Sequence, residues 1–131
     1  MDIKLKYLDE ENGRRREIAQ YYCDNIKNPK IILPVLHHPS SIIHHLSHIW
    51  HLFVIRTPER DSLQKYLATS GIETIIHYPV PPHKQQAYNE WNSISLPITE
   101  KIHSELLSMP MGSHLSNEDL GIIVEKINAY A

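Results

Sequence analysis

The chain has 131 residues, 41% of them hydrophobic, and is long enough to form one domain with its own core. Thirteen basic and fifteen acidic residues give a formal net charge of −2, so no general electrostatic attraction to nucleic acid or an anionic membrane is expected. No apolar run could span a bilayer, no signal peptide follows Met1, and the single cysteine, Cys23, excludes an internal disulfide. We therefore expect one cytoplasmic domain with neither a nucleic-acid nor a membrane partner.

Residues 4–27 are predicted to form a helix, because apolar side chains recur at three- and four-residue steps from Leu5 to Ile26. The polar residues Asn12 and Arg15 interrupt this apolar stripe. Two interpretations stay open: a partly solvated helix, or a helix that packs at each end and passes something polar in the middle. The basic run at residues 14–16 is typical of a solvated face rather than of an anion site.

Three short strands are predicted after this helix. Residues 31–33 lie between prolines and favour a sheet edge, because proline cannot donate to a strand ladder. Residues 50–56 are rich in aromatic and β-branched side chains, and residues 72–78 form the third strand. Between these two strands, residues 61–69 are predicted to form a helix that ends at Gly71.

The last third of the chain is predicted to contain two helices. Pro97 opens the first, which is expected to run to about Leu107 with Met109 on the same apolar stripe. Ser116 is a good N-cap for the second helix, and acidic residues follow it in the first turn of that helix. The expected buried face of this helix consists of Leu120, Ile123, Val124 and Ile127. This order of elements predicts an α+β fold, a small sheet covered by helices.

Histidines are concentrated in a stretch that is predicted to be a loop. Its six histidines are His37, His38, His44, His45, His48 and His51. His44 and His48 would share one face of a helix, a spacing that can bind zinc. No carboxylate occurs between residues 31 and 58, and Pro39 favours a loop. We therefore expect a solvated or subunit-contacting loop and no metal site, with metal binding as the weaker alternative.

The most distinctive segment runs from His77 to Gln86 and reads His-Tyr-Pro-Val-Pro-Pro-His-Lys-Gln-Gln. Its prolines restrict the backbone, so the flanking side chains hold definite directions at low entropic cost. His77 and Tyr78 come at the end of a predicted strand and could together hold sugar hydroxyls or a phosphate oxygen. The residues alone leave an alternative open, in which His77 is a satisfied core histidine and Tyr78 a packing residue.

Other signatures of catalysis are missing from the sequence. It contains no Gly-rich phosphate loop, no nucleophile elbow and no paired-cysteine metal motif. Cys23 follows Tyr22 on an otherwise ordinary helix, so a packing role is favoured over a catalytic cysteine–histidine pair. We expect a domain that contributes to a site without supplying a complete one.

Several segments occur in an order that is found in a known family. They are residues 5–16, 51–56, 60–67 and 71–74, His77-Tyr78-Pro79, Pro82-His83 with Gln85, and residues 107–111 before Leu115-Ser116. Over residues 5–131 they resemble the C-terminal small domain of the DegT-type sugar aminotransferases, in the branch that aminates nucleotide-linked keto-sugars. The resemblance implies an α+β fold with a small, mostly antiparallel sheet flanked by helices, as in the C-terminal domain of aspartate-aminotransferase-like (fold type I) enzymes.

The resemblance also implies pyridoxal phosphate (PLP) chemistry in the intact family enzyme, where a lysine holds the cofactor and glutamate is the usual amino donor. The acceptor is a keto group on a nucleotide-linked hexose in lipopolysaccharide or other deoxyamino-sugar biosynthesis. The family enzymes are homodimers, with active sites between large domain, small domain and partner subunit. By the same resemblance, His77 and Tyr78 are substrate-binding residues, and His83 and Gln85 are either further substrate contacts or caps of a turn.

Only the small domain is covered by this resemblance. Residues 1–28 match the interdomain helix and residues 29–131 the small domain, whereas nothing matches the cofactor-binding large domain or its Schiff-base lysine. We therefore expect a fragment that binds no cofactor alone, does not transaminate alone and self-associates through exposed apolar surface. The polar gap at residues 12–15 would then cross the domain junction. The alternative is a free-standing module that binds a sugar nucleotide or pairs with a separately encoded large domain.

Overall fold

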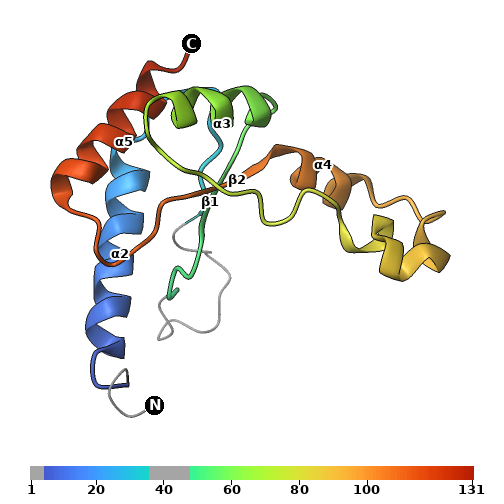
Figure 1. The fold of residues 1–131 in the computed structure, drawn as a ribbon, viewed down its shortest axis with the longest axis horizontal. Helices are drawn as coiled ribbons and strands as arrows, with labels where there is room; N and C mark the ends of the chain where they lie inside the picture. The colour runs from blue at the N-terminus through green and yellow to red at the C-terminus, as the bar shows by residue number, and fades with distance from the viewer. Residues whose placement is uncertain (1–4, 36–47) are drawn as a thin grey trace.

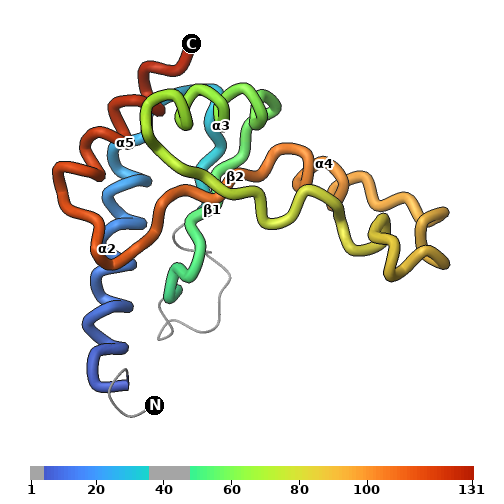
Figure 2. The backbone as a smooth tube through the Cα atoms, in the orientation of Figure 1, coloured from blue at the N-terminus to red at the C-terminus, as the bar shows by residue number. Residues whose placement is uncertain are grey.

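The computed structural model describes residues 5–35 and 48–131, which form two distinct parts (Figure 1). The first part, the body, contains α2 (Leu8–Asn25), β1 (Phe53–Arg56), α3 (Arg60–Thr69), β2 (Leu106–Met109) and α5 (Asn117–Ala129). The second part, the arm (residues 79–105), contains the 3-10 helices η1 (Pro82–Lys84) and η2 (Gln86–Trp91) and the helix α4 (Pro97–Glu105). Figure 2 shows the arm as one excursion of the chain that leaves the body and returns into β2.

The core of the body lies between the sheet, the paired helices α2 and α5, and α3 (Figure 1). Tyr22 of α2 packs on Phe53 of β1 with ring centroids 5.0 Å apart, and both side chains are fully buried. The Tyr22 hydroxyl donates to the carbonyl of Pro110 at 2.9 Å, and burial raises the pKa of Tyr22. Burying each large apolar side chain contributes roughly 1.5–3 kcal/mol, so this core provides most of the stabilisation.

Local sequence signals determine where α3 ends and where α5 begins. Gly71 has φ +77°, the left-handed conformation that favours glycine after a helix, as predicted. Ser116 and Asp119 form a capping box at the start of α5: the Ser116 Oγ accepts from the Asp119 amide at 3.1 Å, and the Asp119 carboxylate accepts from the Ser116 amide at 2.9 Å. The predicted N-cap is therefore confirmed. The predicted apolar face is also buried, with Leu120, Ile123, Val124 and Ile127 in the core.

The sheet is small and antiparallel. β1 pairs with β2 in a register that places Phe53 opposite Met109 and Arg56 opposite Leu106. One further residue pairs at each edge of this layer: Ile32 forms an isolated bridge with Arg56, and Ile75 with Ser108. The strands predicted at residues 31–33 and 72–78 therefore lie beside the sheet, but each is reduced to a single bridge.

The predicted end of the arm helix is wrong. α4 stops at Glu105, and the residues expected to continue it, including Leu107 and Met109, form β2 instead. All four residues of β2 are buried against the body, so tertiary pairing overrides the helical spacing. Pro110 follows at once and disfavours a helical conformation for the residue before it.

Two other predicted boundaries shift. β1 begins at Phe53 rather than at residue 50, because Trp50 has φ 57° and turns the chain before the strand. α2 begins at Leu8 rather than at residue 4 and ends at Asn25. The peptide bond between His77 and Tyr78 is cis.

The predicted solvated basic face of α2 is wrong at two of its three arginines. Arg15 Nη1 donates to the carbonyl of Met111 at 2.8 Å, and Arg14 Nη2 donates to the carbonyl of Leu115 at 2.8 Å. Both arginines therefore tie α2 to the connection between β2 and α5, whereas Arg16 is exposed. The polar interruption of the apolar stripe therefore packs within the body, because the charged guanidinium groups of these arginines donate to backbone carbonyls between β2 and α5.

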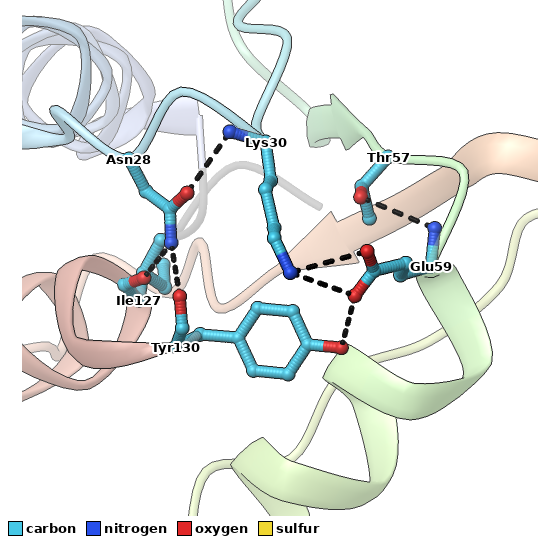
Figure 3. Close-up of polar contacts among 6 residues, drawn as sticks. All are labelled: Asn28, Lys30, Thr57, Glu59, Ile127 and Tyr130. Atoms are coloured by element: carbon cyan, nitrogen blue, oxygen red, sulfur yellow. Dashed lines mark hydrogen bonds and ion pairs between the residues drawn. The ribbon is translucent and has the colours of Figure 1, made fainter.

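A polar cluster, the C-terminal clasp (Asn28, Lys30, Glu59 and Tyr130), holds the residues after α5 against the body (Figure 3). Lys30 Nζ lies 3.1 Å from a Glu59 oxygen, and the Tyr130 hydroxyl donates to the other oxygen at 3.0 Å. Asn28 Nδ2 donates to the Tyr130 carbonyl at 2.8 Å. Hydrogen bonds from Lys30 and then Tyr130 lower the pKa of Glu59, whereas burial and the bond to Glu59 raise the pKa of Tyr130.

Candidate functional site

His77 and Tyr78 lie where the chain leaves the sheet and enters the arm. His77 follows the Ile75 bridge by two residues, and its ring is half-buried. Tyr78 is 65% exposed, and its ring meets that of His77 edge-on, with centroids 5.6 Å apart. The junction between body and arm therefore presents an imidazole beside a phenol. An exposure of this size does not favour the alternative in which Tyr78 is a packing residue.

The His77 ring is held from β2. Its Nδ1 lies 2.9 Å from the hydroxyl of Ser108, whose side chain is buried. No protein partner is recorded for the other ring nitrogen, Nε2, within the part of the chain that the structure describes. One nitrogen of this half-buried ring is thus engaged by β2.

The main chain of Tyr78 is held from the other side by His103. The Nδ1 of His103, in the last turn of α4, donates to the Tyr78 carbonyl at 2.6 Å. Arg60 Nη1 in turn donates to the His103 carbonyl at 2.7 Å. The sequence reasoning missed His103, and no local pattern could have identified it, because it lies 25 residues from its partner.

His83 and Gln85 lie in the same proline-rich loop, but their recorded side-chain contacts are with the arm itself. The buried His83 ring donates from Nε2 to a Glu100 oxygen at 2.9 Å, and that oxygen also accepts from the Leu96 amide at 3.0 Å. Gln85 Nε2 donates to the Val80 carbonyl at 3.2 Å. These contacts favour the turn-capping alternative for both residues. The bond from His83, followed by that from Leu96, lowers the pKa of Glu100.

The arm carries an exposed apolar surface, the arm surface, at its outer end. Tyr88 and Trp91 stack with centroids 4.9 Å apart and planes 5° apart, and each leaves more than two-fifths of its surface exposed. Ile94, Leu96 and Ile98 are exposed beside them along the chain. Patches of this kind mark contacts with other protein surfaces.

The described residues show no metal centre and no cofactor cradle. Residues 5–35 and 48–131 contain no group of three or more ligands that could hold a metal ion. Of the predicted histidine loop, His37, His38, His44 and His45 lie outside the described residues, and His48 Nδ1 accepts from the Trp50 amide at 2.8 Å. None of the lysines that the structure describes is buried, so these residues do not fit the enclosed Schiff-base site that PLP requires. No described helix is long and apolar enough to cross a membrane.

Cys23 has the surroundings of a packing residue. It lies against the core, and burial, with the neighbouring Asp24, raises the pKa of its thiol. A raised pKa lowers the thiolate fraction, and the thiolate is the nucleophile. Both observations favour the packing interpretation over a catalytic cysteine.

Comparisons with known proteins now add to this geometry. The model of the DegT/DnrJ/EryC1/StrS aminotransferase family matches residues 2–128. The chain is 51% identical to dTDP-3-amino-3,6-dideoxy-alpha-D-galactopyranose transaminase from Aneurinibacillus thermoaerophilus, over 99% of this chain and 34% of that protein. It is 36% identical to dTDP-3-amino-3,4,6-trideoxy-alpha-D-glucose transaminase from Streptomyces venezuelae, over 98% of this chain and 33% of that protein. The chain thus spans about a third of the length of these relatives.

Solved structures give the same result for the fold. DesV from S. venezuelae, in complex with a ketimine intermediate, superposes with a TM-score of 0.87 at 36% identity, over 97% of this chain and 33% of DesV. NtdA from Bacillus subtilis, with bound cofactor PMP, gives a TM-score of 0.79 at 26% identity, over 93% of this chain and 28% of NtdA. The resemblance and the predicted fold class are confirmed. Coverage of 97% extends to the arm, which therefore has a counterpart in the longer DesV chain.

Proposed function

This chain belongs to the DegT/DnrJ/EryC1/StrS aminotransferase family, and we propose that it serves as the small-domain part of an enzyme that aminates a nucleotide-linked keto-sugar with glutamate as donor. One observation carries the proposal, namely 51% identity to a dTDP-sugar transaminase over 99% of this chain. The family is PLP-dependent, and the cofactor supplies the electron sink when it is bound in the intact enzyme.

The names of the two dTDP-sugar relatives indicate a substrate class. Both describe sugars that carry the amino group at carbon 3. We propose that the acceptor is a dTDP-linked 3-keto-hexose, in lipopolysaccharide or other deoxyamino-sugar biosynthesis. His77 and Tyr78 would contact this substrate, because an imidazole and a phenol can hydrogen-bond to sugar and phosphate oxygens. Their position at the exposed junction of body and arm supports this role.

The proposed activity depends on further protein. The transaminase relative from A. thermoaerophilus has two-thirds of its length outside the match, and no lysine among the described residues is placed to hold PLP. Apolar side chains are exposed on the arm surface, at Tyr88 and Trp91, and before α2 and at its start, at Tyr7 and Leu8. We propose that these surfaces contact the large domain or a second subunit, as in a homodimeric enzyme.

A complementation assay tests the proposal. The purified chain with PLP, glutamate and a dTDP-3-keto-sugar is expected to show no turnover. Adding the other two-thirds of the A. thermoaerophilus transaminase, produced separately, is expected to restore amination and to form a complex on gel filtration. Turnover by the chain alone would contradict the dependence, and a complex without turnover would contradict the proposed role. A chain carrying His77→Ala and Tyr78→Phe is the matched control, which should form the complex but aminate more slowly.

A second candidate is a free-standing module that binds a sugar nucleotide without catalysis. The exposure of Tyr78 and the only partial burial of His77 favour it, because neither residue is enclosed in this chain by itself. Calorimetric titration of the chain with dTDP-glucose separates the two candidates. Binding that is lost in His77→Ala and Tyr78→Phe supports the module, whereas no binding by the chain alone leaves the small-domain role as the better account.

A further inference from the structure

The contact between Ser108 and His77 indicates which nitrogen of the His77 ring carries the proton. Ser108 is 4% exposed in the middle of β2, and its backbone pairs with Ile75 through two hydrogen bonds of 2.8 and 3.2 Å. This pairing places the Ser108 hydroxyl next to the His77 ring, 2.9 Å from Nδ1. Among the residues that the structure describes, His77 is the recorded side-chain partner of this hydroxyl.

The direction of this hydrogen bond follows from the cost of a buried donor. If His77 Nδ1 carried the proton and donated to Ser108, the serine hydroxyl would keep its own proton with no recorded acceptor. Leaving a buried donor unpaired is costly, whereas a hydroxyl that donates to a bare Nδ1 leaves no buried donor of this pair unpaired. The favoured arrangement therefore has the Ser108 Oγ–H donating to Nδ1. In neutral His77 the proton then resides on Nε2.

Two other histidines of the region show that this arrangement is particular to His77. His103 faces the Tyr78 carbonyl, which can only accept, so its Nδ1 must carry a proton. The His83 Nε2 faces a Glu100 carboxylate, and its ring is enclosed in the arm. Of these three rings, only that of His77 meets a hydroxyl that can donate to it, and the His77 side chain is only half-buried.

We propose that Ser108 is a positioning residue that holds neutral His77 in the Nε2–H tautomer, so that His77 presents a hydrogen-bond donor to an acceptor oxygen of the substrate. The inference rests on the proposed function, in which His77 contacts a nucleotide-sugar. The matching acceptors in that ligand class are phosphate oxygens and a sugar keto oxygen, since neither can donate. His77 thereby favours a keto or phosphate group at this point, and Ser108 sets that preference without touching the ligand.

Nuclear magnetic resonance of the nitrogen-15-labelled chain tests the tautomer without any ligand. A long-range proton–nitrogen correlation spectrum at about pH 8.5, where unperturbed imidazoles are neutral, distinguishes protonated from bare ring nitrogens. The His77 signals are assigned by their loss in His77→Gln. The wild-type chain is expected to show His77 as Nε2–H alone, and Ser108→Ala a mixture of both tautomers. Ser108→Thr, which keeps the hydroxyl, is expected to restore the single tautomer.

A matched control is available in Ser104→Ala, because Ser104 is an exposed serine of α4 whose hydroxyl donates to the Lys101 carbonyl. This variant should leave the His77 signals unchanged. An Nδ1–H tautomer in the wild-type chain would overturn the proposal, and so would a Ser108→Ala spectrum identical to wild type. The wild-type spectrum decides the first point even where Ser108→Ala does not fold.

Titration with dTDP-glucose of the complex between the labelled chain and the separately produced large domain then tests the donor role. Binding is expected to move the His77 Nε2–H signal, and Ser108→Ala is expected to weaken binding about twofold, because a mixture of tautomers leaves only about half of His77 with the proton on Nε2. A ligand that binds without moving this signal would overturn the donor role of His77. If the tautomer is as expected but no ligand binds to the chain or to its complex with the large domain, the result contradicts substrate binding by His77. It still supports the control of the His77 tautomer by Ser108.

Discussion

The body and the arm are built by different means. The buried apolar cluster of the described chain draws on α2, α3, α5 and the sheet, and none of its members comes from residues 79–105. The arm instead keeps its shape through polar contacts, such as His83 with Glu100 and Lys84 Nζ with two backbone carbonyls, and through the Tyr88–Trp91 stack. Because the arm has no apolar core of its own within residues 79–105, its apolar side chains stay exposed, and exposed apolar patches of this kind are typical of contacts with other protein surfaces.

The largest difference between the two parts is expected from truncating one aromatic side chain in each. Phe53→Ala removes a fully buried ring of the body and should lower the free energy of unfolding by about 3–5 kcal/mol. Trp91→Ala removes a half-exposed ring of the arm and should cost less than about 1 kcal/mol. Urea unfolding followed by circular dichroism measures both. Equal losses would show that the arm contributes to a shared core after all.

A second test addresses the point where arm and body meet. Arg56 of β1 places Nε and Nη2 at 3.1 and 2.7 Å from one oxygen of Glu105, the last residue of α4, whose side chain is buried. Arg56→Met leaves this carboxylate without its main partner and should destabilise the chain by roughly 3 kcal/mol. The double variant Arg56→Met/Glu105→Met is expected to recover much of the loss. Thermal unfolding checks the order, and a double variant no more stable than the single one would contradict it.

The smallest effect is expected from Glu100→Gln, which weakens the polar contact that fixes the arm. The pKa of Glu100 is lowered in the folded chain, so its carboxylate stabilises the fold above its ordinary value of 4.5, and the contribution disappears as pH falls through the lowered value. At neutral pH the variant should melt slightly below wild type, and the difference should vanish in acid. Hydrogen exchange should become faster in residues 82–98 only.

Glu59→Gln is the matched control in the body. Glu59 is likewise an exposed carboxylate with a lowered pKa, and it belongs to the C-terminal clasp (Figure 3). The same pH dependence is expected, but the faster exchange should appear at the end of α5. Faster exchange in the arm of this variant, or in the body of Glu100→Gln, would mean that the two parts are coupled more closely than their contacts indicate.

The sequence predicted those features that depend on neighbouring residues. The N-cap at Ser116 and the glycine after α3 are both specified within a few positions. β2 was not predicted, because its partner β1 lies about fifty residues earlier and its spacing also fits a helix. Ser108 and His103 were missed as supports of the candidate site for the same reason, since each lies 25 or more residues from the residue it holds.

The two single-residue bridges at the sheet edges affect how the chain can associate. Ile32 and Ile75 each end the ladder after one pair, so the sheet layer formed by residues 5–35 and 48–131 offers no long row of free main-chain groups to another chain. Short edges of this kind protect against strand addition and fibre growth. If the proposed assembly with another protein forms, it is therefore expected to use exposed side chains, such as those of the arm surface, rather than added strands.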